Sequence, residues 1–247
     1  MMKVLGVIPA RYASGRMPGK PLADICGKPM VWWVYQAAKK SDLLSDVVVA
    51  TDDKRIYDVC KSHEINAVMT RDDHDTPTSR LYEVSTKIDS DLYLMLMGDE
   101  PLINCESFSL IVPEKVESED YVAVLTNIIS KPTEVIDFSN QKCVMNSKRE
   151  ILLISRSPIP YPKGTLDFDY EKVTGIQLFS KHALEFYNAT PKSLLEVAEE
   201  NDLMRFVEND IKVVAIKSPY KTVSVDTLKD LEVVRNVIKS EMNIHEK

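Results

Sequence analysis

Short apolar runs alternate along the chain with segments whose apolar residues recur at helical spacing. The runs are rich in Val, Ile and Leu and are bounded by turn-forming residues, which is typical of buried strands. This pattern predicts strands at residues 3–8, 47–50, 66–69, 92–97, 121–126, 142–145, 151–154, 173–179 and 211–216.

Helical patterns lie between these runs, at residues 29–40, 53–60, from 77 and from about 227. Asp75 or Thr76 can cap the third helix, and Asp226 is predicted to cap the last, with Asp230 near its first turn. Alternating strands and helices predict an α/β fold with a mainly parallel sheet and helices on both faces. We expect one domain over residues 1–247. Residues 158–169, with three prolines and a glycine, form an inserted arm within a region of about 130–190.

The composition narrows the class of partner. The chain has 247 residues, with 31 Lys and Arg against 38 Asp and Glu, a net charge of −7. This balance argues against nucleic acid, and apolar runs such as 92–97 are far shorter than the roughly 18 residues of a membrane span. Four scattered cysteines, with no zinc-ligand spacing and no signal peptide, predict reduced thiols in the cytoplasm.

The first 23 residues carry no acidic side chain, and four of the seven glycines lie within the first 27 residues. Here a strand is followed by Arg11, Gly15, Arg16, Gly19 and Lys20. Glycines let backbone N–H groups approach phosphate oxygens, and the cations supply charge. Neither the P-loop nor the dinucleotide GxGxxG pattern fits. The segment is therefore either a polyphosphate-binding loop or a solvated surface loop, and the lack of acid favours the first.

The run from Ile8 to Leu22, followed by Gly27-Lys28-Pro29-Met30, resembles the start of 3-deoxy-manno-octulosonate (Kdo) cytidylyltransferases. Further similar motifs follow in order along most of the chain: Val49-Ala50-Thr51-Asp52, Thr70-Arg71-Asp72-Asp73-His74, Gly98-Asp99-Glu100-Pro101, Ile154-Ser155-Arg156, Ile159-Pro160 and Val225-Asp226-Thr227. The resemblance implies a single Rossmann-like (GT-A-like) nucleotidyltransferase domain with a small dimerisation arm. The implied activity is Mg²⁺-dependent transfer of CMP from CTP.

The same resemblance implies a CTP site. In relatives the opening loop holds the triphosphate and the 71–80 segment reads cytosine, with Arg71 and Thr78 as the expected readers here. The implied nucleotide-binding residues are Pro9, Ala10, Arg11, Ser14, Gly15, Arg16, Lys20, Arg71, Thr78, Arg80 and Gly98. The alternative for the 74–80 segment is a helix N-terminus capped by Asp75 or Thr76, and both can hold together.

Lys20, Arg16, Asp99 and Asp226 are the implied catalytic residues. Asp99 follows a buried strand, and the carboxyl ends of strands are where open α/β sheets bind ligands. Asp99 and Asp226 would hold Mg²⁺ through hard oxygen ligands and Lys20 would contact the phosphates. For Asp226, the alternative is a simple N-cap.

The departures from the family pattern fall in the implied acceptor site, whose candidate residues are Met97, Arg156, Gln177, Glu196 and Glu199. Met97 stands where relatives have Gln, and a His and a Tyr of the family pattern are Val173 and Gln177 here. A site that hydrogen-bonds its substrate discriminates strongly, so these changes bear on acceptor identity.

Three functions follow from these residues. The first is a cytidylyltransferase acting on Kdo or a related ulosonic acid, or on a different small acidic or phosphorylated acceptor of surface polysaccharide synthesis. The second is a CTP-binding regulator without catalysis, and the third is transfer from UTP or GTP. The relatives imply a homodimer formed through the arm.

Overall fold

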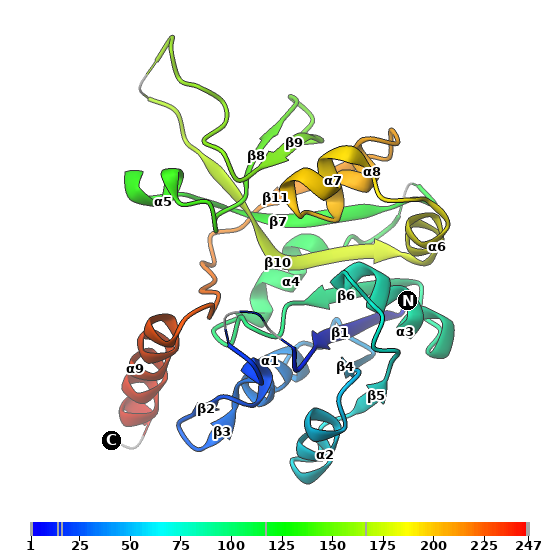
Figure 1. Ribbon diagram of the computed structural model, residues 1–247, viewed down its shortest axis with the longest axis vertical. Coiled ribbons are helices and arrows are strands. Elements are labelled where there is room, and N and C mark those ends of the chain that lie inside the picture. Colours follow the sequence, from blue (N-terminus) through cyan, green and yellow to red (C-terminus); the bar gives the residue numbers. More distant parts are fainter. Residues whose placement is uncertain (1, 14, 16, 117, 166, 246–247) are drawn as a thin grey trace.

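The computed structural model describes residues 2–13, 15, 17–116, 118–165 and 167–245. Its main sheet has strand order β11-β7-β10-β6-β1-β4-β5, with β8 and β9 attached beside β10 (Figure 1). The strands are β1 Val4–Ala10, β4 Asp46–Thr51, β5 Ala67–Met69, β6 Leu92–Leu96, β7 Val122–Ile128, β8 Lys142–Met145, β9 Ile151–Ser155, β10 Glu171–Ser180 and β11 Val213–Lys217. Every predicted strand is present, and the mainly parallel α/β fold is confirmed.

Helices cover both faces of the sheet. Because successive strand residues point to opposite faces, each strand contributes to two cores. One core packs against α1 (Met30–Lys39), α2 (Lys54–Ser62) and α4 (Phe108–Ile111). The other packs against α3 (Pro77–Lys87), α6 (Lys181–Ala189) and α8 (Leu203–Val207).

The remaining elements extend these layers. They are the short helices η1 Lys20–Leu22, η2 Cys105–Ser107, α5 Pro132–Ile136 and α7 Leu194–Glu199, the hairpin strands β2 Asp24–Ile25 and β3 Lys28–Pro29, and the last helix α9 Leu228–His245. α9 forms a third apolar cluster with the β2–β3 hairpin, in the lower left of Figure 1. A chain segment without regular structure, residues 218–227, joins β11 to α9.

Strand β10 runs antiparallel to both of its neighbours, β6 and β7. Its first half therefore lies at the edge of the sheet where β1, β4 and β6 end. Its register to β7 shifts between Val173 and Gln177, and irregularities of this kind are common beside functional sites. Within the shift, the Gly175 carbonyl accepts the Met97 N–H at 2.9 Å. This pairing brings the start of β10 against the end of β6.

The predicted region of about 130–190 contains the antiparallel pair β8–β9, and β8 pairs with the start of β10. The described residues of the predicted arm, 158–165 and 167–169, contain no helix or strand. All four cysteines carry free thiols, as predicted. Within the described ranges, no helix combines the length and apolar character needed to cross a membrane.

Candidate active site

The loop after β1 turns back sharply so that Lys20 begins η1. Gly19 has a left-handed backbone with φ 71° and donates its N–H to the Tyr12 carbonyl at 2.8 Å. A Cβ at this position would lie 3.1 Å from the Tyr12 ring. Glycine is therefore needed for both the backbone conformation and the close approach. The turn directs Lys20 toward the carboxyl end of β6.

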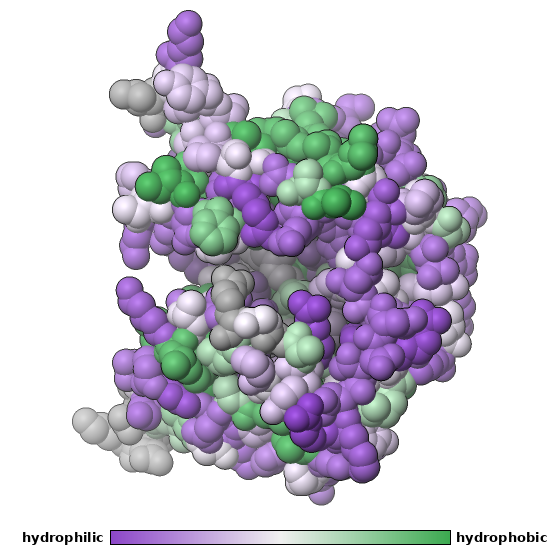
Figure 2. Space-filling model, in the orientation of Figure 1, coloured by the Kyte–Doolittle hydropathy of each residue, from purple (hydrophilic) through white to green (hydrophobic). Residues whose placement is uncertain are grey.

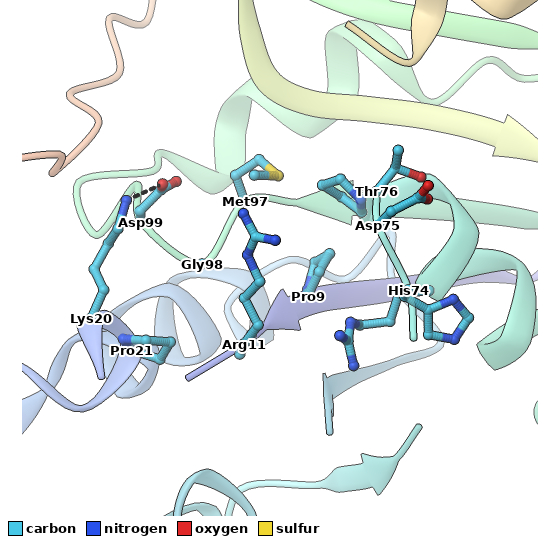
Figure 3. A pocket seen from close by; sticks show the side chains of 13 residues that line it. Pro9, Arg11, Lys20, Pro21, His74, Asp75, Thr76, Met97, Gly98 and Asp99 are labelled. Atoms are coloured by element: carbon cyan, nitrogen blue, oxygen red, sulfur yellow. Dashed lines mark hydrogen bonds and ion pairs between the residues drawn. The ribbon is translucent and has the colours of Figure 1, made fainter. Parts of the chain in front are cut away.

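Lys20 contacts both predicted metal carboxylates. Its Nζ lies 2.8 Å from Asp99 Oδ2 and 3.1 Å from Asp226 Oδ1; Figure 3 draws the Asp99 contact. Burial by itself lowers the pKa of Lys20, but the charges and hydrogen bonds of Asp99 and Asp226 outweigh it and raise the pKa. Lys20 is therefore protonated at neutral pH. Residues separated by 206 positions in the sequence meet here, as predicted.

Asp99 reaches this position because Gly98 lies in the turn that follows β6. A Cβ on Gly98 would lie 2.9 Å from the Pro9 carbonyl oxygen, so only glycine lets the end of β6 pass the end of β1 this closely. The backbone of Asp99 then holds the distant segment, because its carbonyl accepts the Val225 N–H at 2.8 Å. Asp226 follows directly.

The prediction that Asp226 caps the last helix is wrong. α9 begins at Leu228, and Thr227 and Asp230 form a reciprocal cap. Asp230 Oδ2 accepts the Thr227 N–H at 2.8 Å, and Thr227 Oγ1 accepts the Asp230 N–H at 3.3 Å. The Thr-x-x-Asp spacing is the signal that identifies this cap in the sequence. The Asp226 side chain contacts Lys20 instead.

A cavity of about 150 Å³, open to solvent, lies beside these groups. The predicted nucleotide-binding residues on its wall are Pro9, Ala10, Arg11, Lys20, Arg80 and Gly98. His74, Asp75, Thr76 and Pro77 also line this wall. For these residues the sequence predicted a helix cap at Asp75 or Thr76 but no direct nucleotide contact. Thr76 is that cap, since its Oγ1 accepts the Ser79 N–H at 3.1 Å. The predicted residues Ser14 and Arg16 lie outside the described residues.

Three other predicted nucleotide-binding residues lie elsewhere. Thr78 is fully buried and donates its hydroxyl to Asp202 Oδ2 at 2.6 Å. Its side chain therefore faces Asp202 and lines neither cavity. The Arg71 side chain is 68% exposed, pairs with Asp73 at 3.0 Å and lines neither this cavity nor the larger one described below. Gly15 is exposed and lines neither cavity.

Arg80 lies on the cavity wall, but its guanidinium is bound within the protein. Nη2 contacts Asp52 Oδ2 at 3.0 Å, and Nη1 contacts Thr70 Oγ1. Only 3% of Arg80 is exposed. It therefore supports the wall of the cavity instead of presenting its charge to a phosphate.

Glu83 binds the segment that carries His74, which lines the cavity. It accepts the Arg71 N–H at 3.0 Å, contacts His74 Nε2 at 2.5 Å and pairs with Lys87 at 2.6 Å. Burial by itself raises the pKa of Glu83, but hydrogen bonds from Lys87, the Arg71 N–H and His74 outweigh it and lower the pKa to about 2. Folding therefore stabilises the charged carboxylate form of Glu83 relative to its protonated form.

We expect Glu83→Gln to remove a pH-dependent part of the stability. The pKa falls from an ordinary 4.5 to about 2 on folding, so this stabilisation is complete above pH 4.5 and is lost as the pH falls through about 2. Its full size is at most about 3.5 kcal/mol, at about 1.4 kcal/mol per pKa unit. Urea unfolding between pH 6 and pH 2.5 checks this: the free-energy gap between wild type and variant should narrow toward low pH. A gap that stays constant contradicts the assignment.

A second, larger cavity, the acceptor cleft, adjoins the first, and Arg11, Thr76, Met97 and Asp99 line both. Figure 2 shows the hollow between the upper and lower parts of the molecule. The predicted acceptor residues on the cleft wall are Met97, Arg156, Gln177 and Glu196, and Asp226 joins them. Two lysines that the sequence analysis missed, Lys172 and Lys192, also line the cleft. They come from separate segments, so no motif marks them.

Two predicted acceptor residues have carboxylates that are bound within the protein. Both oxygens of Glu196, which is 3% exposed, are bound by Arg205, at 2.6 and 2.7 Å. Glu199 does not line the cleft; it accepts the Ser155 hydroxyl at 2.6 Å and the Arg156 N–H at 2.8 Å. Both glutamates therefore support the cleft wall, and Glu199 orients Arg156.

The carboxylate pair suits a magnesium ion. Within the described part of the chain, no group of three or more His, Cys, Asp or Glu side chains is arranged to hold a metal. Mg²⁺ is nevertheless commonly held by one or two carboxylates, with substrate phosphates and water as its other ligands. Asp99 and Asp226 supply this donor set, because both already converge on one cation, the Lys20 ammonium.

Residues 5–216 match the family described as Cytidylyltransferase. The chain is 37% identical over 243 residues to 3-deoxy-manno-octulosonate cytidylyltransferase of Escherichia coli, covering 98% of each chain. It is 38% identical over 240 residues to the enzyme of that name from Fusobacterium nucleatum, covering 96% of this chain and 98% of the relative.

Solved structures agree. A CMP:2-keto-3-deoxy-manno-octonic acid synthetase complexed with CTP matches with a TM-score of 0.90 and 38% identity, over 97% of this chain and 99% of that one. A 4-diphosphocytidyl-2C-methyl-D-erythritol synthase from Anaerococcus prevotii, 14% identical with a TM-score of 0.64 over 96% of this chain and 99% of that one, shares the fold. The chain therefore belongs to the 3-deoxy-manno-octulosonate cytidylyltransferases, a family of nucleotidyltransferase enzymes.

Proposed function

We propose that this chain transfers CMP from CTP to Kdo or a related ulosonic acid and releases pyrophosphate. The observation that carries the proposal is the contact of Lys20 with both Asp99 and Asp226 where the two cavities join. The relatives support it, since their names state this activity and one similar structure contains CTP. CTP would occupy the smaller cavity and the acid the acceptor cleft.

In this reaction an acceptor hydroxyl oxygen attacks the α-phosphorus of CTP and loses its proton. The bond from that phosphorus to the oxygen bridging toward the β-phosphate breaks, and pyrophosphate leaves. Mg²⁺ held by Asp99 and Asp226 would neutralise phosphate charge. The Lys20 ammonium would balance charge on the departing pyrophosphate, and Arg11, which lines both cavities, would orient the phosphates.

The acceptor cleft suits an anion. Arg11, Arg156, Lys172 and Lys192 line it from four separate parts of the chain. Acidic side chains line the cleft as well, and Lys192 is paired with Asp75 at 2.6 Å. Arg11, Arg156 and Lys172 are therefore the cations that would orient an acidic substrate. The carboxylate of a sugar acid would meet this charge.

A variant acceptor is a second candidate, because the three departures from the family pattern lie in this one cleft. Met97, Val173 and Gln177 all line it, and Gln177 Oε1 is buried without a hydrogen-bond partner in the described part of the chain. A different small acidic or phosphorylated compound of surface polysaccharide synthesis would then replace Kdo.

Pyrophosphate release tests the proposal. The protein, CTP and Mg²⁺ are incubated with Kdo, 8-amino-Kdo, other ulosonic acids and small phosphorylated compounds, and UTP and GTP serve as alternative donors. Turnover with CTP and a ulosonic acid supports the proposal, and turnover only with another acceptor supports the variant. CTP binding without turnover on any acceptor favours a regulator, while faster turnover with UTP or GTP contradicts the choice of CTP.

We also propose that the chain forms a homodimer through the 130–190 region. Large apolar side chains there are open to solvent, including Leu152 at 58% and Tyr161 at 85% exposure. We expect light scattering to give twice the 28.0 kDa chain mass, and Leu152→Glu with Tyr161→Ser to lower it toward that of one chain. Exposed apolar patches of this kind mark interfaces. A monomer in the wild type at micromolar concentration contradicts the assignment.

A further inference from the structure

A buried carboxyl side chain, Glu100, lies next to Asp99 and has no part in the chemistry described above. It is 3% exposed, and both hydrogen bonds to Oε1 come from neutral donors. These are the Gly175 N–H at 3.0 Å and the Ser224 hydroxyl at 3.1 Å. Oε2 is buried with no hydrogen-bond partner in the described part of the chain. A buried carboxyl group is costly to fold, so the contacts it makes call for an explanation.

Glu100 joins three segments that are distant in sequence. Its own loop follows β6, Gly175 lies at the register shift of β10, and Ser224 lies in the 218–227 segment. That last segment makes no strand ladder and carries Asp226 two residues after Ser224. Two hydrogen bonds close to Asp226 join the 218–227 segment to the loop after β6. The Val225 N–H donates to the Asp99 carbonyl, and the Ser224 hydroxyl donates to Glu100 Oε1.

The junction at Gly175 leaves no spare space. A Cβ there would lie 2.6 Å from Met97 Cβ and 2.8 Å from Glu100 Oε1. Only glycine lets its N–H reach the Glu100 carboxyl while its carbonyl accepts the Met97 N–H at 2.9 Å. Gly175 thus fixes the Glu100 side chain from β10 while Ser224 holds it from the other side.

We propose that Glu100 is a positioning residue that sets the spacing between Asp99 and Asp226. It is adjacent to Asp99 in the chain, and through Ser224 it fixes the segment that carries Asp226. Its Oε1 accepts the hydrogen bonds of both Gly175 and Ser224, so its effect is transmitted through those contacts. The inference rests on the proposed function, in which the two carboxylates bind a divalent cation beside CTP.

The test compares Glu100→Ala, Glu100→Gln and Ser224→Ala. Ser218→Ala is the matched control, because Ser218 lies in the same segment and, among the described residues, its hydroxyl bonds only to the Tyr220 backbone. Mn²⁺ affinity in the presence of CTP, without acceptor, is measured by proton relaxation enhancement, and kcat and KM are measured with the best acceptor. Neighbours of metal ligands typically affect metal affinity or activity by about 10- to 100-fold.

For Glu100→Ala we expect Mn²⁺ affinity and kcat to fall about tenfold, with the acceptor KM changed less than about threefold. Glu100→Gln keeps an oxygen acceptor for both donors and should stay within about threefold of wild type, Ser224→Ala should fall between, and Ser218→Ala should match wild type.

Wild-type Mn²⁺ affinity in folded Glu100→Ala would overturn the proposal, as would a Gln variant as weak as the Ala variant, since the charge would then be what matters. If the Ala variant does not fold, Ser224→Ala decides, and equality with Ser218→Ala overturns the proposal. The Mn²⁺ measurement needs no acceptor, so absence of turnover in wild type would refute the proposed function while the positioning role is still judged.

Discussion

Lys20→Met should lower kcat by about 100- to 1000-fold while the protein stays folded. Lys20 is the cation placed between Asp99 and Asp226, at 2.8 and 3.1 Å. Its loss removes the ammonium group that contacts both carboxylates, and with it a positive charge from the proposed position of the phosphates. Removing one group that stabilises developing charge typically costs a factor of this size. Steady-state kinetics with saturating CTP measures the change.

The matched control is Lys39→Met. Lys39 pairs with Asp46 at 3.3 Å on the surface, where both side chains are about half exposed, and exposed pairs contribute little. We expect wild-type kcat for this variant. A kcat within about threefold of wild type for Lys20→Met would contradict a role for Lys20 at the phosphates.

Arg205→Met should destabilise the protein by about 3–5 kcal/mol. Arg205 binds both oxygens of Glu196, donates to the Tyr187 carbonyl at 2.8 Å and lies 3.7 Å from the Tyr187 ring centre. Both charged groups are almost fully buried. Removing the arginine leaves Glu196 charged and unpaired behind the acceptor cleft, which is the costly case for a buried pair.

Urea unfolding at pH 7 measures this effect. The double variant Arg205→Met with Glu196→Gln should regain much of the loss, since the buried charge is then gone. Lys54→Met is the control for a surface pair, with Lys54 and Asp58 at 2.8 Å and both exposed, and should cost less than about 1 kcal/mol. A loss below about 1 kcal/mol for Arg205→Met would show that Glu196 is not held by this pair.

The elements of the fold could be predicted because their signals are local. The apolar run at β6 and the proline that starts α3 each identify their element without reference to the rest of the chain. The antiparallel direction of β10 could not be predicted in this way, because direction is decided by which strands it pairs with. That direction brings Gly175 and Gln177 to the active edge.

Some residues of the candidate site could likewise be predicted from the sequence, and others could not. The family resemblance of the glycine-rich loop and of Gly98-Asp99-Glu100-Pro101 predicted the Lys20 cluster. The structure adds that Gly19 and Gly98 suit the tight backbone geometry there. The contacts of Thr78 with Asp202 and of Glu196 with Arg205 could not be predicted, because a polar residue in a motif carries no sign of its burial. The cations Lys172 and Lys192 gather only when the chain folds.

The proposed role of the Lys20–Asp99–Asp226 cluster is to catalyse transfer of CMP to a sugar acid. Mass spectrometry of a reaction containing CTP, Kdo and Mg²⁺ tests it most directly, with wild type and the Asp99→Asn and Asp226→Asn variants in parallel. We expect wild type to form CMP–Kdo and pyrophosphate in equal amounts. Either variant should form at least about 100-fold less product. Product formed at the wild-type rate by either variant would contradict this role.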